Sequence, residues 1–481
     1  MEENANKNIQ VNETAAPSQA PVRRRRPKTK AEIFKESTLP LIILGVSAVL
    51  ILVFIIGSIT RAVQKKHVTR EASIAVSESI AAEEARLASE IEAILTKSEE
   101  LAAGYAYDEA LALIDSFSGN IGGYPQLQDA RARYEYSKQA LVLWEDPNNI
   151  INLSFQTLIA DPNRAFNHPQ WGSALLKNYI TTDEFRTILQ RLYDAGYILV
   201  SMSDFVQSTT NEQGITTFTY KELYLPEGKK PIMLTHTNVN YPLYLVDSDG
   251  DMVADKGGVG IASKLVLDSS GNVTCEMVDA NGNVITGSYD FIPILDEFVE
   301  EHPDFSYGGS KAVIGLTGYN GLFGYRTHPD GRATFGEAAY EQDVASVQAI
   351  AEALTESGYD LGYYTYENSA YSNYTLSMIQ GEMNRWNAEV VPILGNLDYM
   401  IFAQESDIGS SVLYSGEKFN YLKSCGFKYF IGYDTDGVSF TYIAEDYIRQ
   451  GRLMVTGKYL TYNSSWYSTI FDTSDVLEYD R

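Results

Sequence analysis

The sequence predicts an α/β domain of barrel-like or parallel-sheet architecture, preceded by a transmembrane helix and a helical stalk. Three observations lead to this prediction. A long uncharged apolar run lies near the N-terminus, an Ala/Glu-rich region with helical periodicity follows it, and beyond about residue 149 short β-like runs alternate with amphipathic helices. A chain of 481 residues is ample for a tail, an anchor, a stalk and one large domain.

The predicted anchor is the segment 37–60, which contains no charged side chain. Leu39–Ile59 is long enough to cross a hydrocarbon core as a helix, and a cleaved signal peptide would have a shorter apolar run. Seven Lys and Arg residues lie just before it, from Arg23 to Lys35, and fewer follow it closely. By the positive-inside rule, residues 1–36 form a disordered basic cytoplasmic tail of a single-pass cell-membrane protein, and its C-terminal domain is extracellular.

Residues 61–146 are predicted to form an extracytoplasmic helical stalk. Leu87, Ile91, Ile94 and Leu95 give residues 68–103 a narrow apolar stripe with helical spacing. The following segment, to about Trp144, reads as a helix–turn–helix that resembles one tetratricopeptide-like unit. A single unit cannot bury its own apolar face, so it must pack on a neighbour. Its role is that of a spacer or, alternatively, of a partner-docking or dimerisation segment.

The formal net charge of the whole chain is −26, and its negative charge lies in the part beyond the anchor. Residues 1–66 hold 11 Lys and Arg against 5 Glu, so the remainder is strongly acidic. An acidic surface keeps a domain soluble and disfavours nucleic acid as a partner. The two cysteines, Cys275 and Cys425, lie in unrelated contexts and favour free thiols over a disulfide.

Residues 147–481 carry the alternating pattern of the predicted α/β domain. We expect strands at 151–158, 197–200, 231–235, 312–316 and 361–364, and helices at 182–195, 292–301, 338–357 and 375–387. Residues 245–290 depart from this pattern, because the turn signals DSDGD, DSSGN and DANGN separate short alternating runs there. This interval is predicted to be an insertion of β-hairpins.

A family resemblance begins with TTDEFRTILQRLYDAGYILVSMSDFV (Thr181–Val206) and KKPIMLTHTNVNY (Lys229–Tyr241). These segments resemble the opening of the NodB-type polysaccharide deacetylase domain, and KAVIGLTGYNG, GYDLGYYTYENSAY, IFAQESD and KFNYLKSCGFKYFIG continue in the family's order. The resemblance covers roughly residues 150–460. It implies a deformed (β/α) barrel with its site at the C-terminal ends of the strands. In the family, an Asp and two His hold a divalent metal, and a second Asp is the general base.

Carried over position by position, the family's site is degenerate in this sequence. The base position holds Thr237, the metal Asp position holds Asn238, and the two His positions hold Tyr364 and Asn368. These neutral side chains are weak ligands for a catalytic divalent cation. The resemblance therefore implies a member of the fold without a metal, a cofactor or the family's catalytic base.

The remaining candidate residues are assigned to glycan binding or to structure. His236, Asn240, Tyr241 and the tyrosines Tyr363, Tyr364, Tyr366 and Tyr371 fall where the resemblance places the cleft, and aromatic rings suit sugar faces. A metal site rebuilt around His236 is the alternative for that residue. The run Asp247–Asp251 alternates carboxylates like a calcium loop, but Met252 and Gly258 occupy the positions of its essential Gly and Glu, which favours a turn.

Three functions follow from these observations. The first is a membrane-anchored pseudoenzyme that binds a cell-wall or capsular polysaccharide without hydrolysing it. The second is an active carbohydrate deacetylase with a rearranged site, and the third is a protein-interaction module of the cell envelope. The missing ligands favour the first function over the second.

Overall fold

The computed structural model describes residues 68–409, 413–433 and 437–480. The predicted cytoplasmic tail (1–36) and membrane helix (37–60) lie outside these ranges. Among the described residues, no helix is both long and apolar enough to span a membrane. The chain divides into two compact units, one of residues 1–91 with 116–120 and the other of residues 92–115 with 121–481.

The predicted stalk helices are present. Helix α2 (Val68–Ala103) confirms the long Ala/Glu-rich helix, and Arg86 donates to Glu83 and Glu90 on the adjacent turns at 2.9 and 3.3 Å. Helices α3 (Tyr107–Asp115) and α4 (Pro125–Gln139), with the 3₁₀ turn η1 (Ile121–Gly123) between them, form the predicted helical hairpin.

The second compact unit begins well before the predicted boundary at residue 147. The Tyr105 hydroxyl donates to the carbonyl of Asp304 at 2.7 Å, and the Tyr105 ring stacks on Tyr307 with 6.1 Å between centroids. Strand β1 (Leu141–Leu143) pairs antiparallel with β6 (Tyr224–Pro226). These contacts join the segment after α2 to the α/β domain, and no local sequence pattern predicted this pairing.

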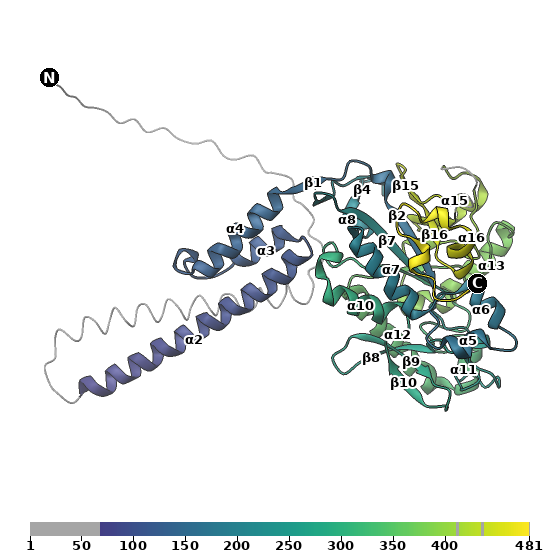
Figure 1. The fold of residues 1–481 in the computed structure, drawn as a ribbon, viewed down its shortest axis with the longest axis horizontal. Coiled ribbons are helices and arrows are strands. Elements are labelled where there is room, and N and C mark those ends of the chain that lie inside the picture. Colours follow the sequence, from purple (N-terminus) through teal and green to yellow (C-terminus); the bar gives the residue numbers. More distant parts are fainter. Residues whose placement is uncertain (1–67, 410–412, 434–436, 481) are drawn as a thin grey trace, which may run out of the picture. The chain divides into compact units, whose positions relative to one another are not determined.

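The centre of the α/β domain is a closed barrel of seven parallel strands (Figure 1). Strand β16 pairs back with β2 through Leu453 opposite Leu153, which closes the circle. The prediction of a barrel is confirmed, and the alternative of an open parallel sheet is excluded for this structure. In order around the barrel the strands are β2 (Ile151–Gln156), β7 (Lys230–Thr237), β11 (Val313–Leu316), β12 (Asp360–Tyr363), β13 (Tyr399–Ile401), β14 (Tyr429–Tyr433) and β16 (Ile448–Met454).

Two further strands extend the barrel sheet, and helices cover it. Strand β3 (Tyr197–Leu199) pairs with the first half of β7, and β15 (Phe440–Ile443) pairs antiparallel with β16. A capping box between Thr181 and Glu184 starts α7. The helices are α5 (Pro162–Phe166), α6 (Gly172–Asn178), α7 (Thr182–Asp194), α8 (Met202–Phe205), α9 (Leu243–Val246), α10 (Phe291–Glu301), α11 (Pro329–Phe335), α12 (Glu337–Glu356), α13 (Leu376–Glu389), α14 (Val391–Leu394), α15 (Glu417–Ser424) and α16 (Gly457–Tyr462).

The barrel strands are buried on both faces, as expected for a parallel sheet inside a layer of helices. Inside the barrel, Met233, Val313, Ile401 and Ile431 belong to one apolar cluster. Outside it, a larger cluster packs the strands against the helices and includes Phe155 and Phe291, whose ring centroids are 5.6 Å apart. The two cores fix the strand ends in space and thereby the loops that follow them.

The predicted insertion is a separate antiparallel sheet. Strands β8 (Lys264–Leu267), β9 (Val273–Val278) and β10 (Val284–Gly287) form two hairpins, with Asp268 and Asp279 at the start of their turns. Backbone and side-chain hydrogen bonds from Asn283 lower the pKa of Asp279 to about 2. The DSDGD run differs from the prediction, because it forms a loop after α9 and not a hairpin turn. Another hairpin, β4 (Val206–Thr210) with β5 (Thr216–Tyr220), lies outside the insertion.

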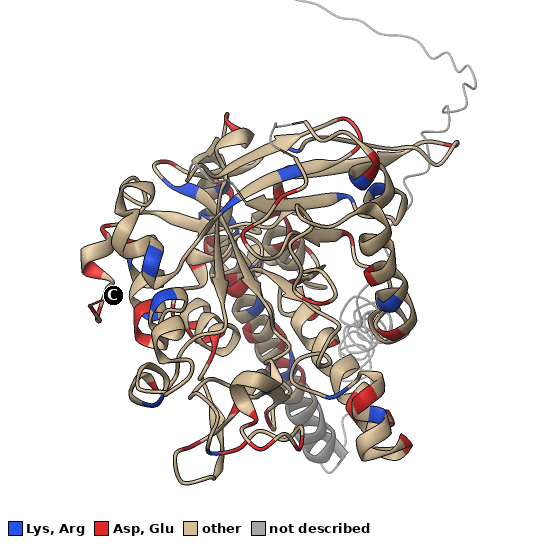
Figure 2. Cartoon of the chain, turned by 90° about the vertical axis from the view of Figure 1, so that its right-hand side faces the viewer, with Lys and Arg blue, Asp and Glu red and all other residues tan. Residues whose placement is uncertain are grey.

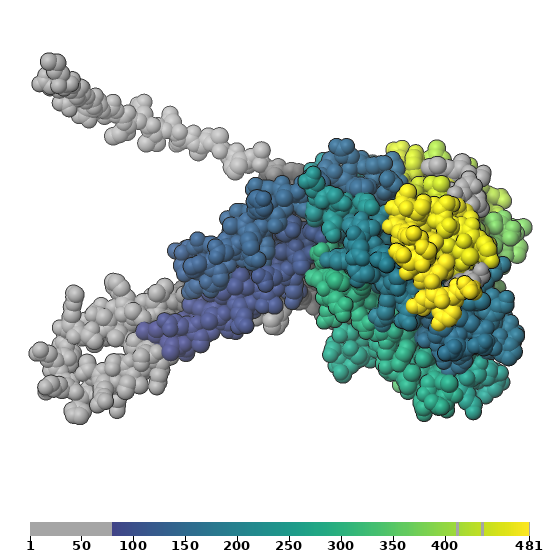
Figure 3. All heavy atoms as spheres, viewed as in Figure 1, coloured from purple at the N-terminus to yellow at the C-terminus, as the bar shows by residue number. Residues whose placement is uncertain are grey.

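Segments far apart in sequence lie together on the surface of the α/β domain. In Figure 3 the C-terminal residues, in yellow, lie beside the blue segment that follows β2, and the rings of Phe166 and Tyr479 pack 4.9 Å apart. Figure 2 shows the acidic residues spread over many helices and loops and not gathered in one patch. Cys275 and Cys425 are free thiols, as predicted.

Candidate functional site at the carboxyl end of the barrel

The four positions that the family resemblance singled out lie at the C-terminal ends of two barrel strands. Thr237 ends β7 and Asn238 follows it, whereas Tyr364 and Asn368 follow β12, and only β11 lies between these strands. A Cβ placed on Gly315 of β11 would lie 3.2 Å from Thr237 Cγ2 and 3.2 Å from Tyr364 Cβ. Thr237 and Tyr364 therefore flank β11 at the same level of the barrel.

Two of these four side chains hold a buried polar atom that has no hydrogen-bond partner among the described residues. Thr237 does have a partner, because its hydroxyl donates to the carbonyl of Phe155 at 3.1 Å. Asn238 and Tyr364 are only 3% and 4% exposed, and the side-chain oxygens of Asn238 and Asn368 are buried without a partner. Buried polar groups are nearly always hydrogen-bonded in native proteins, so unpartnered groups mark a place where a ligand or solvent completes the site.

Backbone strain gathers at the same end of the barrel. Ten non-glycine residues in the described chain have a positive φ, and eight of them follow the ends of four adjacent strands. Such conformations cost free energy and concentrate at active sites and ligand clamps. The eight are Asn238 and Tyr241 after β7, Asn320 and Phe323 after β11, Thr365 and Asn368 after β12, and Gln404 and Glu405 after β13.

Unpartnered buried polar atoms are also frequent at this end. They come from residues on or after β2, β7, β11, β12 and β16, so they surround the barrel mouth rather than one strand. Strain and unpartnered polar atoms together locate the candidate site without reference to any family. The atoms are Ser154 Oγ, Thr157 Oγ1, Asn238 Oδ1, Asn240 Oδ1, Thr317 Oγ1, Asn368 Oδ1 and both Nε and Nη1 of Arg452.

His236 faces away from this mouth. Its ring stacks on Phe291 of α10, with centroids 4.6 Å apart and planes 3° from parallel, and its Nε2 lies 3.3 Å from Asp290 Oδ2. The same carboxylate oxygen accepts from the Tyr241 hydroxyl at 2.7 Å. Neighbouring residues of a strand point to opposite sides, so His236 lies on the outer face of β7 and Thr237 on the inner face. His236 therefore does not line the cleft in which the resemblance placed it, and Asn238 leaves the strand with φ of 66°.

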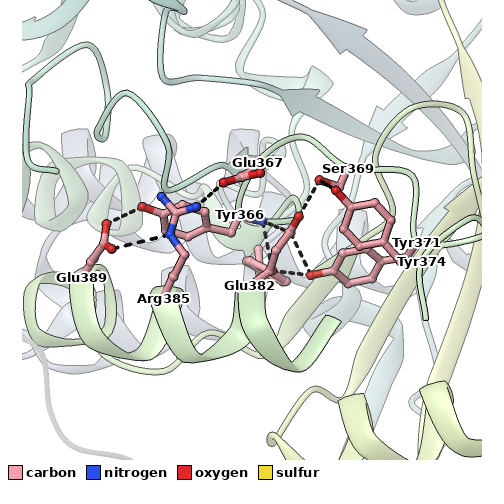
Figure 4. Close-up of polar contacts among 9 residues, drawn as sticks. Tyr366, Glu367, Ser369, Tyr371, Tyr374, Glu382, Arg385 and Glu389 are labelled. Atoms are coloured by element: carbon pink, nitrogen blue, oxygen red, sulfur yellow. Dashed lines mark hydrogen bonds and ion pairs between the residues drawn. The ribbon is translucent and has the colours of Figure 1, made fainter. Parts of the chain in front are cut away.

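The tyrosines that the sequence placed in the cleft are mostly structural. Tyr363, Tyr366 and Tyr371 are fully buried, and Glu382 of α13 accepts from the Tyr371 hydroxyl at 3.1 Å and from the Tyr366 amide at 2.9 Å (Figure 4). Glu382 also accepts from Ser369, and the Tyr366 hydroxyl donates to Glu389. These rings offer no face to a ligand in this structure, and neither does the fully buried Tyr241. Their contacts instead hold the loop that carries Asn368.

Asn240 has one hydrogen bond at the mouth. Its amide donates to the carbonyl of Tyr319 at 2.7 Å, while its side-chain oxygen is buried without a partner. Asn240 thus ties the loop after β7 to the loop after β11. Of the predicted glycan-binding residues, Asn240 and Tyr364 are the two whose polar groups lie at the mouth.

A different set of aromatic residues surrounds the mouth, and sequence reasoning missed it. Burial raises the pKa of Tyr179, and the nearby phenols of Tyr244, Tyr319 and Tyr364 add to the effect, so these four hydroxyls lie close together. Tyr244 is 46% exposed and packs 5.2 Å from Trp171. Tyr319 follows a predicted strand in the sequence TGYNG, and that position was the available signal for it.

Sequence reasoning also missed Arg452, because β16 was not predicted as a strand. On the inner face of β16, Gln450 takes part in a hydrogen-bonded network with Asn152 of β2. Arg452 lies two residues further toward the mouth, so it shares that face. It is fully buried, and this burial lowers its pKa. The alternation of Gln450 and Arg452 in IRQGRLMV was the available signal.

The acidic loop after α9 gathers three carboxylates. Oxygens of Asp247, Asp249 and Asp255 lie within 4.8 Å of one another. Most of the hydrogen-bonding capacity of these carboxylates is used by backbone amides of the same loop. For example, the Met252 amide donates to Asp247 at 2.9 Å and the Gly257 amide donates to Asp255 at 2.6 Å. Burial lowers the pKa of Arg326 to about 10, and its attraction to Asp247 opposes that shift. These hydrogen bonds within the loop stabilise it, although it is not the hairpin turn that was predicted.

Comparisons with known proteins complete the description of the site. No protein-family model matches the chain, and no curated protein sequence matches it significantly. Among solved structures, this chain is similar to the Streptococcus pyogenes deacetylase PplD in complex with acetate. The similarity covers 65% of this chain and 94% of the PplD chain, with 12% sequence identity and a TM-score of 0.34.

Proposed function

We propose that this chain is a membrane-anchored extracytoplasmic protein whose deacetylase-like barrel binds a cell-wall or capsular glycan without hydrolysing it. The observation that carries the proposal is the barrel mouth itself. Strained backbone and unpartnered buried polar atoms mark it as a functional site, while the positions that would carry a catalytic metal and base hold neutral side chains.

The residues present do not fit a catalytic divalent metal. A deacetylase of this type requires a carboxylate and two imidazoles as ligands, and a second carboxylate as base. Asn238, Tyr364 and Asn368 supply two amides and a phenol instead, and the hydroxyl of Thr237 already donates to Phe155. His236 is directed toward α10, which argues against the alternative of a rearranged metal site around it.

The aromatic residues at the mouth support glycan recognition. Aromatic faces with polar tips suit sugar rings. Four such residues lie in the segments that follow β2, β7 and β11, namely Trp171, Tyr179, Tyr244 and Tyr319. Binding of this kind needs shape and hydrogen bonds but no metal. The third function, a protein-interaction module, would use the helical segment 68–145 instead of the mouth.

The first experiment separates binding from hydrolysis. The purified full-length chain is analysed for bound Zn²⁺, Co²⁺ and Ni²⁺, for acetate release from acetylated wall polysaccharides, and for binding to the same polysaccharides. We expect binding without stoichiometric metal and without acetate, and we expect Tyr244→Ala to weaken it. Tyr136→Ala, at a tyrosine that is 76% exposed on α4, is the matched control. Tight metal binding together with acetate release would contradict the proposal.

The second experiment tests the anchor. Protease added to intact, wall-stripped cells should digest residues 150–481, because the basic residues before the apolar run orient the N-terminus to the cytoplasm. Protection of this region in intact cells, with digestion after lysis, would refute the extracytoplasmic location and with it a wall glycan as ligand. Pull-downs with and without residues 68–145 test the protein-interaction alternative.

A further inference from the structure

Arg452 is a buried cation without a carboxylate partner among the described residues. Its side chain is fully buried, and its Nη2 donates to the carbonyl of Phe402 at 2.6 Å, while Nε and Nη1 have no partner. Arginine is rarely buried without an ion pair, because the desolvated charge is costly. Arg449 on the same strand follows the rule, since its Nη2 lies 3.1 Å from Asp407 Oδ2.

Two carboxylates of the described residues, Asp407 and Glu405, interact electrostatically with Arg452, but both are engaged elsewhere. Asp407 pairs with Arg449, and Glu405 accepts from the Tyr459 hydroxyl at 2.6 Å. The group that does face Arg452 is Tyr364, whose ring centroid lies 5.6 Å from the guanidinium carbon. The charge of Arg452 is therefore directed at the mouth that Tyr364 lines and where the side-chain oxygens of Asn238 and Asn368 have no partner among the described residues.

The polarity of the site is opposite to that of a metal site. Carboxylates and imidazoles present lone pairs to a cation. A phenol hydroxyl instead donates a hydrogen bond, and an Asn amide can turn its nitrogen toward a ligand. Positive charge beneath hydrogen-bond donors is the arrangement that favours an oxyanion. The chain as a whole carries a formal charge of −26, so an anion would be recognised at this place and repelled by most of the surface.

We infer that the barrel mouth binds an anionic group of its ligand, a carboxylate or a phosphate, with Asn238, Tyr364 and Asn368 as hydrogen-bond donors and Arg452 as the charge beneath them. This inference rests on the proposed glycan-binding function and specifies its ligand class. The ligand is an acidic glycan, whose acidic group is a sugar carboxylate or a phosphodiester.

The test measures binding of simple probes to the full-length chain at constant ionic strength. D-glucuronate, inorganic phosphate and the neutral sugar D-glucose are titrated by calorimetry. We expect at least one anion to bind at millimolar concentration and D-glucose to bind more weakly. Arg452→Met should reduce the affinity for that anion by about tenfold, the effect of losing one charge-assisted contact. Arg452→Lys should retain most of it.

Two further variants keep the test decisive. Arg332→Met removes one exposed positive charge that pairs with Glu337, so it should leave anion binding unchanged. Tyr364→Phe removes only a hydroxyl and should weaken binding about threefold, even if Arg452→Met fails to fold. Binding of D-glucuronate alone identifies a carboxylated sugar, and binding of phosphate alone identifies a phosphorylated one.

The inference and the proposed function can fail separately. If neither anion binds, or if Arg452→Met and Tyr364→Phe bind as wild type does, the inference is overturned. Binding of neutral wall polysaccharide would still support the proposed function in that case. If the anions bind through Arg452 but no polysaccharide does, the anion site is supported, whereas its assignment to a glycan and the glycan-binding function are contradicted.

Discussion

The loop that carries Asn368 depends on one buried carboxylate, and Glu382→Ala is the sharpest test of that dependence. Glu382 is 5% exposed and accepts from the Tyr366 amide at 2.9 Å, from the Tyr371 hydroxyl at 3.1 Å and from Ser369. A hydrogen bond to a charged acceptor contributes about 1.5–3 kcal/mol. The three bonds are not additive, because Tyr363 offers the Tyr366 amide a second acceptor at 3.0 Å.

We therefore expect Glu382→Ala to lower the free energy of unfolding by about 3 kcal/mol. At about 2 °C per kcal/mol for a large domain, the melting temperature should fall by roughly 6 °C. Differential scanning calorimetry of the full-length chain measures the change. Glu382→Gln keeps one acceptor oxygen and should lose about half as much.

The matched control lies on the same helix. Glu389 is only partly buried, accepts from the Tyr366 hydroxyl and has Arg385 as an ion-pair partner at 3.8 Å. Because this ion pair is long and the Arg385 side chain is 46% exposed, Glu389→Gln should cost less than about 1 kcal/mol. The reasoning is refuted if Glu382→Ala melts within a degree of wild type, or if both substitutions cost the same.

Three further predictions concern the metal, the helical segment and pH. A fourfold variant, with Thr237→Asp, Asn238→Asp, Tyr364→His and Asn368→His, restores the family ligands. It should not take up metal on elemental analysis unless Arg452→Met is added, because a buried guanidinium repels a divalent cation. Metal uptake by the fourfold variant alone would contradict this role of Arg452. Tyr105→Ala should lower the free energy of unfolding by about 3 kcal/mol, because the Tyr105 ring is only 9% exposed and stacks on Tyr307. A loss as small as that caused by Tyr136→Ala would argue against this packing. Burial raises the pKa of Asp360 in the folded protein. The protonated carboxyl therefore stabilises the fold below the pKa of the unfolded chain, and this stabilisation is lost as pH rises through the pKa of the folded protein. Asp360→Asn should therefore stabilise the protein more at pH 8 than near pH 4 in thermal melts, whereas an equal gain at both pH values would exclude this cause.

The barrel mouth of this acidic protein contains a buried positive charge. An acidic chain contains one fully buried arginine whose counter-ion is absent from the described residues, at the end of the barrel where unpartnered amides gather. A buried uncompensated charge lowers stability, and natural proteins retain such features chiefly at functional sites. The same reasoning makes Arg452 more informative than any of the tyrosines that the sequence pattern emphasised.

The sequence by itself determined the order and kind of most elements of the α/β domain. Strands such as Lys230–Thr237 and helices such as Thr182–Asp194 lie within a few residues of their predicted positions, because local periodicity and caps define them. The sequence also placed Thr237, Asn238, Tyr364 and Asn368 at strand ends, where a barrel carries its site. The prediction of an anchor at 37–60 depends on local composition alone and stays a prediction.

Only the tertiary structure decided which side chains face the mouth. Tyr363 and Tyr364 are neighbours, yet the first is bonded within the core beside Glu382 and the second lies over Arg452, because the strand turns alternate residues inward and outward. His236 was expected in the cleft, but its ring stacks on Phe291 of α10, on the outer face of the barrel. Arg452, Tyr179, Tyr244 and Tyr319 come from four separate segments, and their convergence depends on the closure of β16 onto β2 and on loop conformations that no local pattern encodes.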